Sequence, residues 1–135
     1  MSESIYPALH GTAVLLCIDD DEDILECEKS FLESFGHTVL IATTGGRGLE
    51  LATMHAIDIV IVDYLMPEMN GHEFATKMKL LNPQAAIIML SAAVNIPQKT
   101  LTLVDAVIAK NSLASELLPA IATLHGCRSA FRCDA

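Results

Sequence analysis

The segment DIVIVDYLMPEMNG, residues 58–71, carries a continuous apolar run that ends in an aspartate, Asp63. Runs of this kind are typical of central strands in parallel sheets, because such strands are covered on both faces. A second continuous run, AVLLCI at residues 13–18, is followed directly by Asp19 and Asp20. These two strands, each ending in carboxylates, guide the interpretation of the rest of the chain.

Short apolar runs alternate with helical patterns along the sequence, and this alternation is typical of a parallel sheet with crossover helices. The predicted strands are residues 13–18, 38–42, 57–62, 86–90 and 106–109. The predicted helices are residues 24–35, 45–56, 71–81, 95–104 and 112–124, the fourth of them short. The sequence therefore predicts one α/β domain with a five-stranded parallel sheet.

The first and last predicted helices carry further signals. Six apolar residues in the first helix are spaced for one helix face: Ile24, Leu25, Cys27, Phe31, Leu32 and Phe35. Gly36 supplies a stop signal after them. Pro119 in the last helix predicts a kink, or a start later than Ser112, because proline removes a backbone hydrogen bond.

The cysteines form neither a CxxC pair nor a zinc-ligand pattern with histidine, so reduced thiols are expected. They are Cys17, Cys27, Cys127 and Cys133. Core packing is the simplest explanation for Cys17 in the first strand and for Cys27 on the apolar side of the first helix. Four histidines are assigned to loops or helix surfaces without a chemical role: His37, His55, His72 and His125.

The composition limits the classes of function. With 135 residues, of which 52% are hydrophobic, the chain has enough apolar material for one compact domain. Its net charge of −9 and its 8 Lys and Arg residues argue against nucleic-acid binding, which needs clustered positive charge. The first residues lack a signal-peptide pattern, and no apolar run approaches the roughly 20 residues that cross a bilayer. The expectation is a cytoplasmic protein without membrane insertion.

The predicted strand ends define a candidate site. In open parallel sheets, ligands bind outside the carboxyl ends of the strands, where the winding of the sheet reverses. Asp19, Asp20 and Asp63 are therefore expected to converge on one crevice. The fourth strand ends at Ser91 and the fifth at Lys110, on the same edge. A hydroxyl and an ammonium group are thus expected to face an acidic cluster.

Several blocks of the sequence together resemble the receiver domain of bacterial response regulators. They are IDDDEDI at residues 18–24, DIVIVDYLMPEMNGHE at 58–73, IIMLSA at 87–92, and Lys110, in the order of the family. The resemblance covers roughly residues 12–125, which leaves residues 1–11 as an N-terminal extension and residues 126–135 as a C-terminal tail. It implies a flavodoxin-like, doubly wound five-stranded parallel sheet of order 2-1-3-4-5 with helices on both faces.

The resemblance implies that Asp63 accepts a phosphoryl group from the phosphohistidine of a histidine kinase or a histidine phosphotransfer protein. Asp19 and Asp20 would hold Mg²⁺, the second of them directly, together with Asp63 and the backbone carbonyl of Leu65. Such oxygen atoms, with water and a phosphoryl oxygen, form the octahedral ligand set that Mg²⁺ prefers. The protein would be no enzyme in the usual sense, because it catalyses only its own phosphorylation and dephosphorylation.

The resemblance also assigns roles to Lys110 and Ser91. Lys110 would neutralise charge during phosphoryl transfer, and Ser91 would hydrogen-bond a phosphoryl oxygen and move toward it as a switch. Two positions depart from the family pattern: Val107 replaces an aromatic residue, and Asn111 replaces the proline after the lysine. Signalling through the fifth strand is therefore expected to differ or to be absent. A cis bond after Lys110 would cost about 2.5 to 4 kcal/mol without proline, so that bond is either trans or strained.

The remaining acids of the first block have a simpler interpretation. Asp21, Glu22 and Asp23 are expected to be solvated acids in the first turn of a helix. Asp19 and Asp20 can cap the same helix in addition to binding a cation.

A receiver that works alone by docking onto a protein target is expected, because no basic helix-turn-helix pattern follows the last predicted helix. The sequence does not identify that target. One alternative is a receiver-like interaction module that is not phosphorylated in use, which Val107 and Asn111 favour. Another is a Mg²⁺-dependent aspartyl phosphatase of the haloacid dehalogenase type, which needs a second acid where Leu65 stands. Leu65 also predicts slow loss of the phosphoryl group, because an apolar side chain does not orient an attacking water.

Overall fold

One parallel sheet organises the fold. The computed structural model describes residues 12–92 and 95–134, with side chains up to Gly126. Its five strands lie in the order β2-β1-β3-β4-β5, which confirms the predicted topology. The strands are β1 Val14–Ile18, β2 Thr38–Ala42, β3 Ile59–Asp63, β4 Ala86–Ser91 and β5 Ala106–Ala109.

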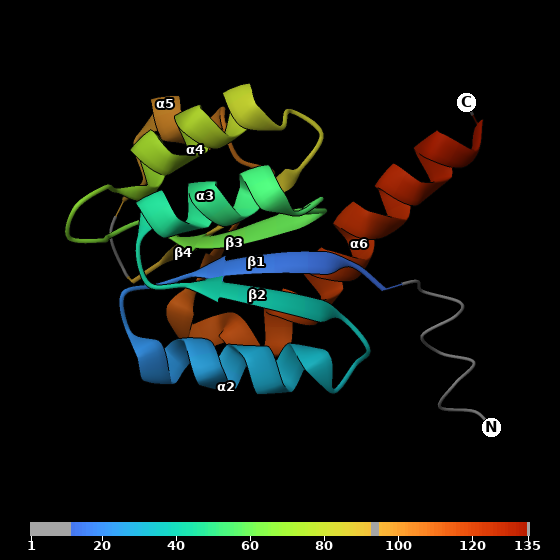
Figure 1. The fold of residues 1–135 in the computed structure, drawn as a ribbon, viewed down its shortest axis with the longest axis horizontal. Helices are drawn as coiled ribbons and strands as arrows, with labels where there is room; N and C mark the ends of the chain where they lie inside the picture. The colour runs from blue at the N-terminus through green and yellow to red at the C-terminus, as the bar shows by residue number, and fades with distance from the viewer. Residues whose placement is uncertain (1–11, 93–94, 135) are drawn as a thin grey trace.

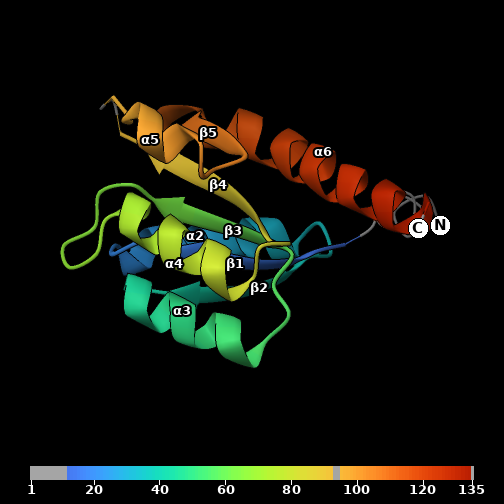
Figure 2. The same ribbon diagram turned by 90° about the horizontal axis from the view of Figure 1, so that it is seen from above.

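Helices cover both faces of the sheet, as predicted. They are α2 Glu22–Glu33, α3 Gly45–Met54, α4 Gly71–Leu81, α5 Gln98–Leu101 and α6 Leu113–Asp134, with a short 3₁₀ helix, η1 Lys110–Ser112, before α6. Figures 1 and 2 show α3 and α4 on one face of the sheet and α2 on the other. The fourth predicted helix is short, because α5 has only 4 residues.

The core has two layers, one on each face of the sheet. Leu25 and Leu32 of α2 and Ile121 of α6 pack against one face, while Phe74 and Met78 of α4 pack against the other. Alternate residues of each strand point to opposite faces, so every strand contributes to both layers. All residues of β3 are buried, which explains its continuous apolar sequence.

The buried face of α2 agrees only in part with the predicted one, which included the buried Leu25 and Leu32. Leu25, Glu28 and Leu32 face the sheet, whereas Cys27 is exposed. The prediction that core packing explains Cys27 was therefore wrong, and Phe31 at 37% exposure and Phe35 at 48% are not core residues either. The predicted set combined this buried stripe with an exposed one of the same helical spacing, because both carry apolar residues.

The end of α2 and the course of α6 also refine the predictions. Gly36 has φ 96°, in the left-handed region that favours glycine, so it ends the helical segment as predicted. Helix α6 continues to Asp134, ten residues beyond its predicted end at residue 124, and it passes through Pro119. Its backbone therefore crosses the predicted boundary of the C-terminal tail. None of the helices in the described part of the chain is both long and apolar enough to span a bilayer.

Two glycines of α3 predict opposite effects of the same substitution. A Cβ at Gly48 would clash with Ile18 Cδ1 and lie 3.3 Å from Phe74 Cε1, whereas a Cβ at Gly46 would meet nothing within 4 Å. Gly48→Ala is expected to lower the free energy of unfolding by roughly 1 to 3 kcal/mol, because Ile18 and Phe74 are fully buried. Gly46→Ala is expected to raise it by up to about 1 kcal/mol through helix propensity. Urea unfolding of both variants measures the difference, and shifts in the same direction would contradict it.

Candidate functional site

Three carboxylates lie together at the carboxyl edge of the sheet. Asp19 follows β1 and Asp63 ends β3, and these two strands pair side by side with Ile18 opposite Val62. One oxygen from each of Asp19, Asp20 and Asp63 lies within 4.8 Å of the others. Asp19 and Asp63 are buried and Asp20 is exposed, so the cluster opens to solvent on one side. The structure thus brings together the three predicted acids.

Lys110 reaches into this cluster from the turn after β5. Its Nζ atom donates a hydrogen bond of 2.8 Å to Asp63 Oδ2 and lies 3.1 Å from Asp19 Oδ2. Burial alone would lower the pKa of Lys110, but the bonds to Asp63 and Asp19 raise it above its ordinary value of 10.5. The ammonium group is therefore charged at neutral pH and compensates two buried carboxylates.

Asp19 has one satisfied oxygen and one without a hydrogen bond. Oδ1 accepts a bond of 2.9 Å from the Asp21 backbone N–H, while Oδ2 has no aligned hydrogen-bond partner in the described residues despite the nearby Lys110. Burial raises the pKa of Asp19, and the Asp21 N–H and Lys110 oppose this effect. A buried carboxylate oxygen of this kind is a suitable ligand for a hard cation.

The acids after Asp20 hold the start of α2. Asp21 is its N-cap and accepts hydrogen bonds from the backbone N–H groups of Asp23 and Ile24. The capping role therefore belongs to Asp21 and not to Asp19 or Asp20. Glu22 and Asp23 form the predicted acidic first turn. These acids stabilise the helix by their position near its N-terminus.

The loop after Asp63 is held by short contacts. The Leu65 N–H donates to Asp63 Oδ1 at 3.3 Å, and the Gly71 N–H donates to the Tyr64 carbonyl at 2.7 Å. A Cβ at Gly71 would lie 2.9 Å from Tyr64 Cα, so glycine permits this close approach. The Leu65 side chain is 51% exposed, and its carbonyl as a cation ligand stays a prediction.

The fourth and fifth strands end beside the acidic cluster. Ser91 is buried at the end of β4, opposite Ala109 of β5. No peptide bond in residues 12–92 and 95–134 is cis, so the bond between Lys110 and Asn111 is trans. Val107 in β5 is exposed and leaves no aromatic ring at that position.

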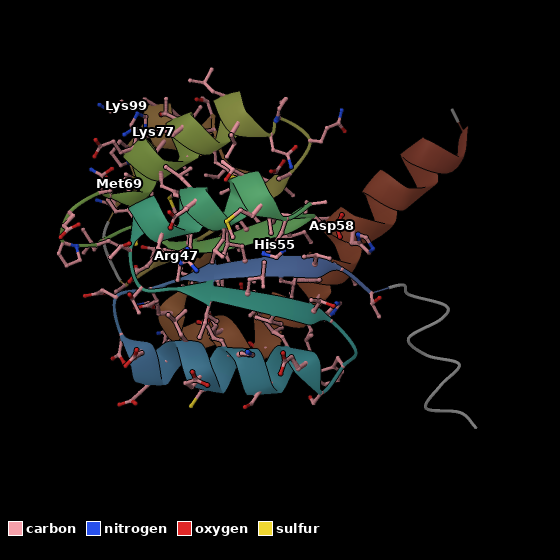
Figure 3. All side chains as sticks on the ribbon, viewed as in Figure 1. Arg47, His55, Asp58, Met69, Lys77 and Lys99 are labelled. Carbon is pink, nitrogen blue, oxygen red and sulfur yellow. The ribbon has the colours of Figure 1, made fainter. Side chains whose placement is uncertain are left out.

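A cleft of about 200 Å³ opens beside Asp20. Its other walls are the start of α3 and the loop after β3, namely Thr43, Thr44, Gly45 and residues 66–69. Figure 3 shows Met69 of this loop at one end of the molecule and Asp58, just before β3, toward the other. The cleft therefore lies at the same end as the acidic cluster.

The sequence analysis missed Glu28, a third buried acid, which lies on the same face of the sheet as Cys17. Glu28 is 5% exposed, and the Cys17 thiol donates a hydrogen bond to it. Burial first, and then the charge of Asp19, raises the pKa of Glu28 from 4.5 to about 7. The signal was its spacing, three residues after Leu25 and four before Leu32, which puts it on the same helix face as these leucines.

The structure defines the surroundings of three histidines, His37, His72 and His125. His37 Nδ1 accepts a hydrogen bond of 3.0 Å from the Ala13 N–H, and His72 Nδ1 lies 2.9 Å from Thr100 Oγ1. His125 is buried at 8% exposure, so its predicted surface position was wrong. It follows Ile121 by one turn and continues the buried stripe of α6.

Comparison with known proteins gives a consistent match. The family model of the response regulator receiver domain matches residues 15–122. The transcriptional regulatory protein GlrR of Escherichia coli (strain K12) is 34% identical over 88 residues, which are 65% of this chain and 20% of that protein. The response regulator SaeR of Staphylococcus epidermidis is 36% identical over 78 residues, 58% of this chain and 34% of that protein. The chain therefore spans about a fifth to a third of the length of these relatives.

Solved structures agree with this match. A response regulator receiver domain protein from Clostridium thermocellum has a TM-score of 0.81 and 29% identity, over 88% of this chain and 98% of that one. The response regulator protein TrrA from Thermotoga maritima, in complex with Mg²⁺-BeF, has a TM-score of 0.77 and 26% identity, over 83% and 98% of the two chains.

Glu28 predicts a pH dependence of the free energy of unfolding when divalent cations are removed. Because its pKa rises from 4.5 to about 7 on folding, the folded state holds the proton more tightly between these values. Its stabilising contribution is therefore fully present below pH 4.5 and is lost as the pH rises to about 7, by up to about 3 kcal/mol. Urea unfolding in EDTA across this range measures the loss.

Two glutamine variants provide the comparison. Glu28→Gln cannot ionise and should lose less stability than the wild type as the pH rises. Glu26→Gln removes an exposed acid from the same helix and should follow the wild type. Equal losses in all three proteins would show that Glu28 does not carry this pH dependence.

Proposed function

Because this chain belongs to the response regulator receiver domain family, we propose that Asp63 accepts a phosphoryl group from the phosphohistidine of a histidine kinase or a histidine phosphotransfer protein. The domain would then signal, or relay the phosphoryl group, through phosphorylation-dependent binding of another protein. The observation that carries this proposal is the buried Asp63 carboxylate, which accepts a hydrogen bond of 2.8 Å from Lys110 and has an oxygen within 4.8 Å of oxygens of Asp19 and Asp20.

Asp63 would act as the nucleophile. One of its carboxylate oxygens attacks the phosphorus atom, the bond between phosphorus and the donor imidazole nitrogen breaks, and its electron pair stays on the imidazole. The product is an acyl phosphate on Asp63. The Leu65 N–H and Lys110 Nζ hold the two carboxylate oxygens and so orient the group. Lys110 also offsets the negative charge that arrives with the phosphoryl group.

The donor set suits Mg²⁺. Asp19, Asp20 and Asp63 supply hard carboxylate oxygens, and the Asp19 Oδ2 atom has no aligned hydrogen bond to lose in the described structure. These three residues would hold the cation, with the Leu65 carbonyl as a further ligand. When bound, Mg²⁺ would neutralise charge on the phosphoryl oxygens. The Mg²⁺-BeF complex of the related TrrA supports this assignment.

The response to phosphorylation would begin at Ser91. Its place at the end of β4, on the same edge as Asp63, suits a hydroxyl that hydrogen-bonds a phosphoryl oxygen. With Val107 in β5, no aromatic side chain is available there to follow a movement of Ser91. We infer that the altered surface involves other residues near the site and that the partner is a protein, since the net charge of −9 disfavours nucleic acid.

The first prediction of this proposal concerns the acyl phosphate. Incubation with Mg²⁺ and acetyl phosphate should add one phosphoryl group to the intact mass of the wild type. Asp63→Asn should abolish the adduct because it lacks the nucleophile, and Lys110→Ala should slow its formation by roughly 100-fold. Glu26→Gln, on the exposed face of α2, is the control and should react normally. No adduct would favour an interaction module that is not phosphorylated, and an adduct that survives Asp63→Asn would show that Asp63 is not the acceptor.

The second prediction concerns the lifetime of the adduct. Leu65 lies two residues after Asp63 with its side chain 51% exposed, and this side chain cannot orient an attacking water. The phosphoryl group should therefore persist for minutes or longer in the wild type. Leu65→Glu should shorten this lifetime several-fold, whereas Leu80→Glu on the exposed side of α4 should not. A wild-type half-life of seconds would contradict the role given to Leu65.

A further inference from the structure

Glu28 is a buried acid without adequate compensation in the described structure. It lies on the face of α2 that packs against the sheet, between Leu25 and Leu32. Its Oε2 atom has no hydrogen-bond partner in the described residues. The carboxyl group interacts instead with the thiol of Cys17. A thiol is a weak donor, so an ionised Glu28 would be poorly stabilised there.

The charged groups that act on Glu28 belong to the candidate site. The carboxylates of Asp19, just after β1, and of Asp63, at the end of β3, oppose its ionisation, while Lys110 from η1 favours it. The thiol of Cys17 stays protonated, because burial and the charge of Glu28 raise its pKa well above 9.0. Helix α6, on the same face as α2, contributes apolar side chains to this part of the core. No described hydrogen bond joins Glu28 to the three aspartates, so the coupling acts through the electric field.

We propose that Glu28 couples Mg²⁺ binding to proton release: it holds a proton in the cation-free protein and releases it when the cation binds at Asp19, Asp20 and Asp63. The proton leaves the Glu28 carboxyl group for solvent, and the negative charge stays on the carboxylate. Glu28 does not touch the cation and is therefore a positioning residue that acts by its charge. This inference rests on the proposed function, because it uses the same cation site.

The charge balance of the site is the physical reason. Without a divalent cation, three carboxylates face one ammonium group, and a further negative charge on the buried Glu28 would be repelled by Asp19 and Asp63 against the attraction of Lys110. A divalent cation brings two positive charges to the cluster, so that the site would attract a negative charge on Glu28 and no longer oppose it. The effect is strong because the surroundings of Glu28 are apolar. Linkage requires the converse, so Mg²⁺ should bind more tightly once Glu28 is ionised.

Titration calorimetry with Mg²⁺ alone measures the coupling. Titrations in buffers of different ionisation enthalpy give the number of protons released for each Mg²⁺ bound. At about pH 7, where Glu28 is about half protonated, the wild type should release roughly half a proton more than Glu28→Gln. Between about pH 6 and pH 8, the Kd of the wild type should fall up to roughly tenfold more than that of Glu28→Gln.

Glu26→Gln is the matched control, because it removes one exposed negative charge from the same helix. It should release as many protons as the wild type, since its side chain is exposed and lies outside the buried stripe of α2. Infrared difference spectra provide a second measurement: Mg²⁺ should remove the carbonyl band of a protonated carboxyl group in the wild type, and Glu28→Gln should lack that change. Should Glu28→Gln fail to fold, the wild-type spectrum and the pH profile of its proton release, which should rise as the pH falls from 8 to 7 and reach its maximum below pH 7, decide the question.

Equal proton release from the wild type and Glu28→Gln, no release from the wild type, or no binding of Mg²⁺ would overturn the inference. The acetyl phosphate assay separates this inference from the proposed function. Proton release that depends on Glu28, without an adduct on Asp63, would overturn only the proposed function. An adduct on Asp63, without proton release that depends on Glu28, would overturn only the inference.

Discussion

The contacts of Lys110 with Asp63 and Asp19 are the interaction on which the arrangement of the site depends. One ammonium group lies 2.8 Å from one carboxylate and 3.1 Å from the other, and both carboxylates are buried. Like charges at such positions would otherwise repel, and one of the acids would take up a proton. The turn after β5 is thereby tied to the ends of β1 and β3. Charge compensation across three segments far apart in the sequence thus defines this edge of the sheet.

The fully covered sheet makes this arrangement possible. Pairing of β1 with β3 places Ile18 opposite Val62, so the residues that follow them emerge side by side. Helices pack on both faces, which leaves the carboxyl edge as the place where polar groups gather. The strand ends then hold the charged groups, while the loop after Asp63 and the Asp21 cap of α2 shape the surroundings. Glu28 adds a buried charge behind this edge, within the electrostatic reach of the same groups.

Sequence patterns predicted the strands well and the helix faces less well. Continuous apolar runs identify buried strands because both of their faces are covered, and the predicted bounds of residues 38–42 and 106–109 agree fully with β2 and β5. The buried face of α2 was predicted only in part, because two stripes share one spacing and the buried stripe contains an acid, Glu28. His125 is buried because it continues the stripe of α6 that contains Ile121. A histidine gives no apolar signal, so the sequence pattern did not predict this burial. Local spacing identifies a helix but does not select the face that a neighbouring sheet covers.

By itself, the sequence determined the element order, the aspartates that end the first and third strands, and the chemistry expected of them, because these follow from local apolar runs and residue types. Only the tertiary structure decided which oxygens meet, which of the acids caps α2, and that Lys110 bridges Asp19 and Asp63. It alone also revealed Glu28 as a buried acid with a raised pKa. These features depend on long-range packing and on the exclusion of water, which adjacent residues along a chain do not encode.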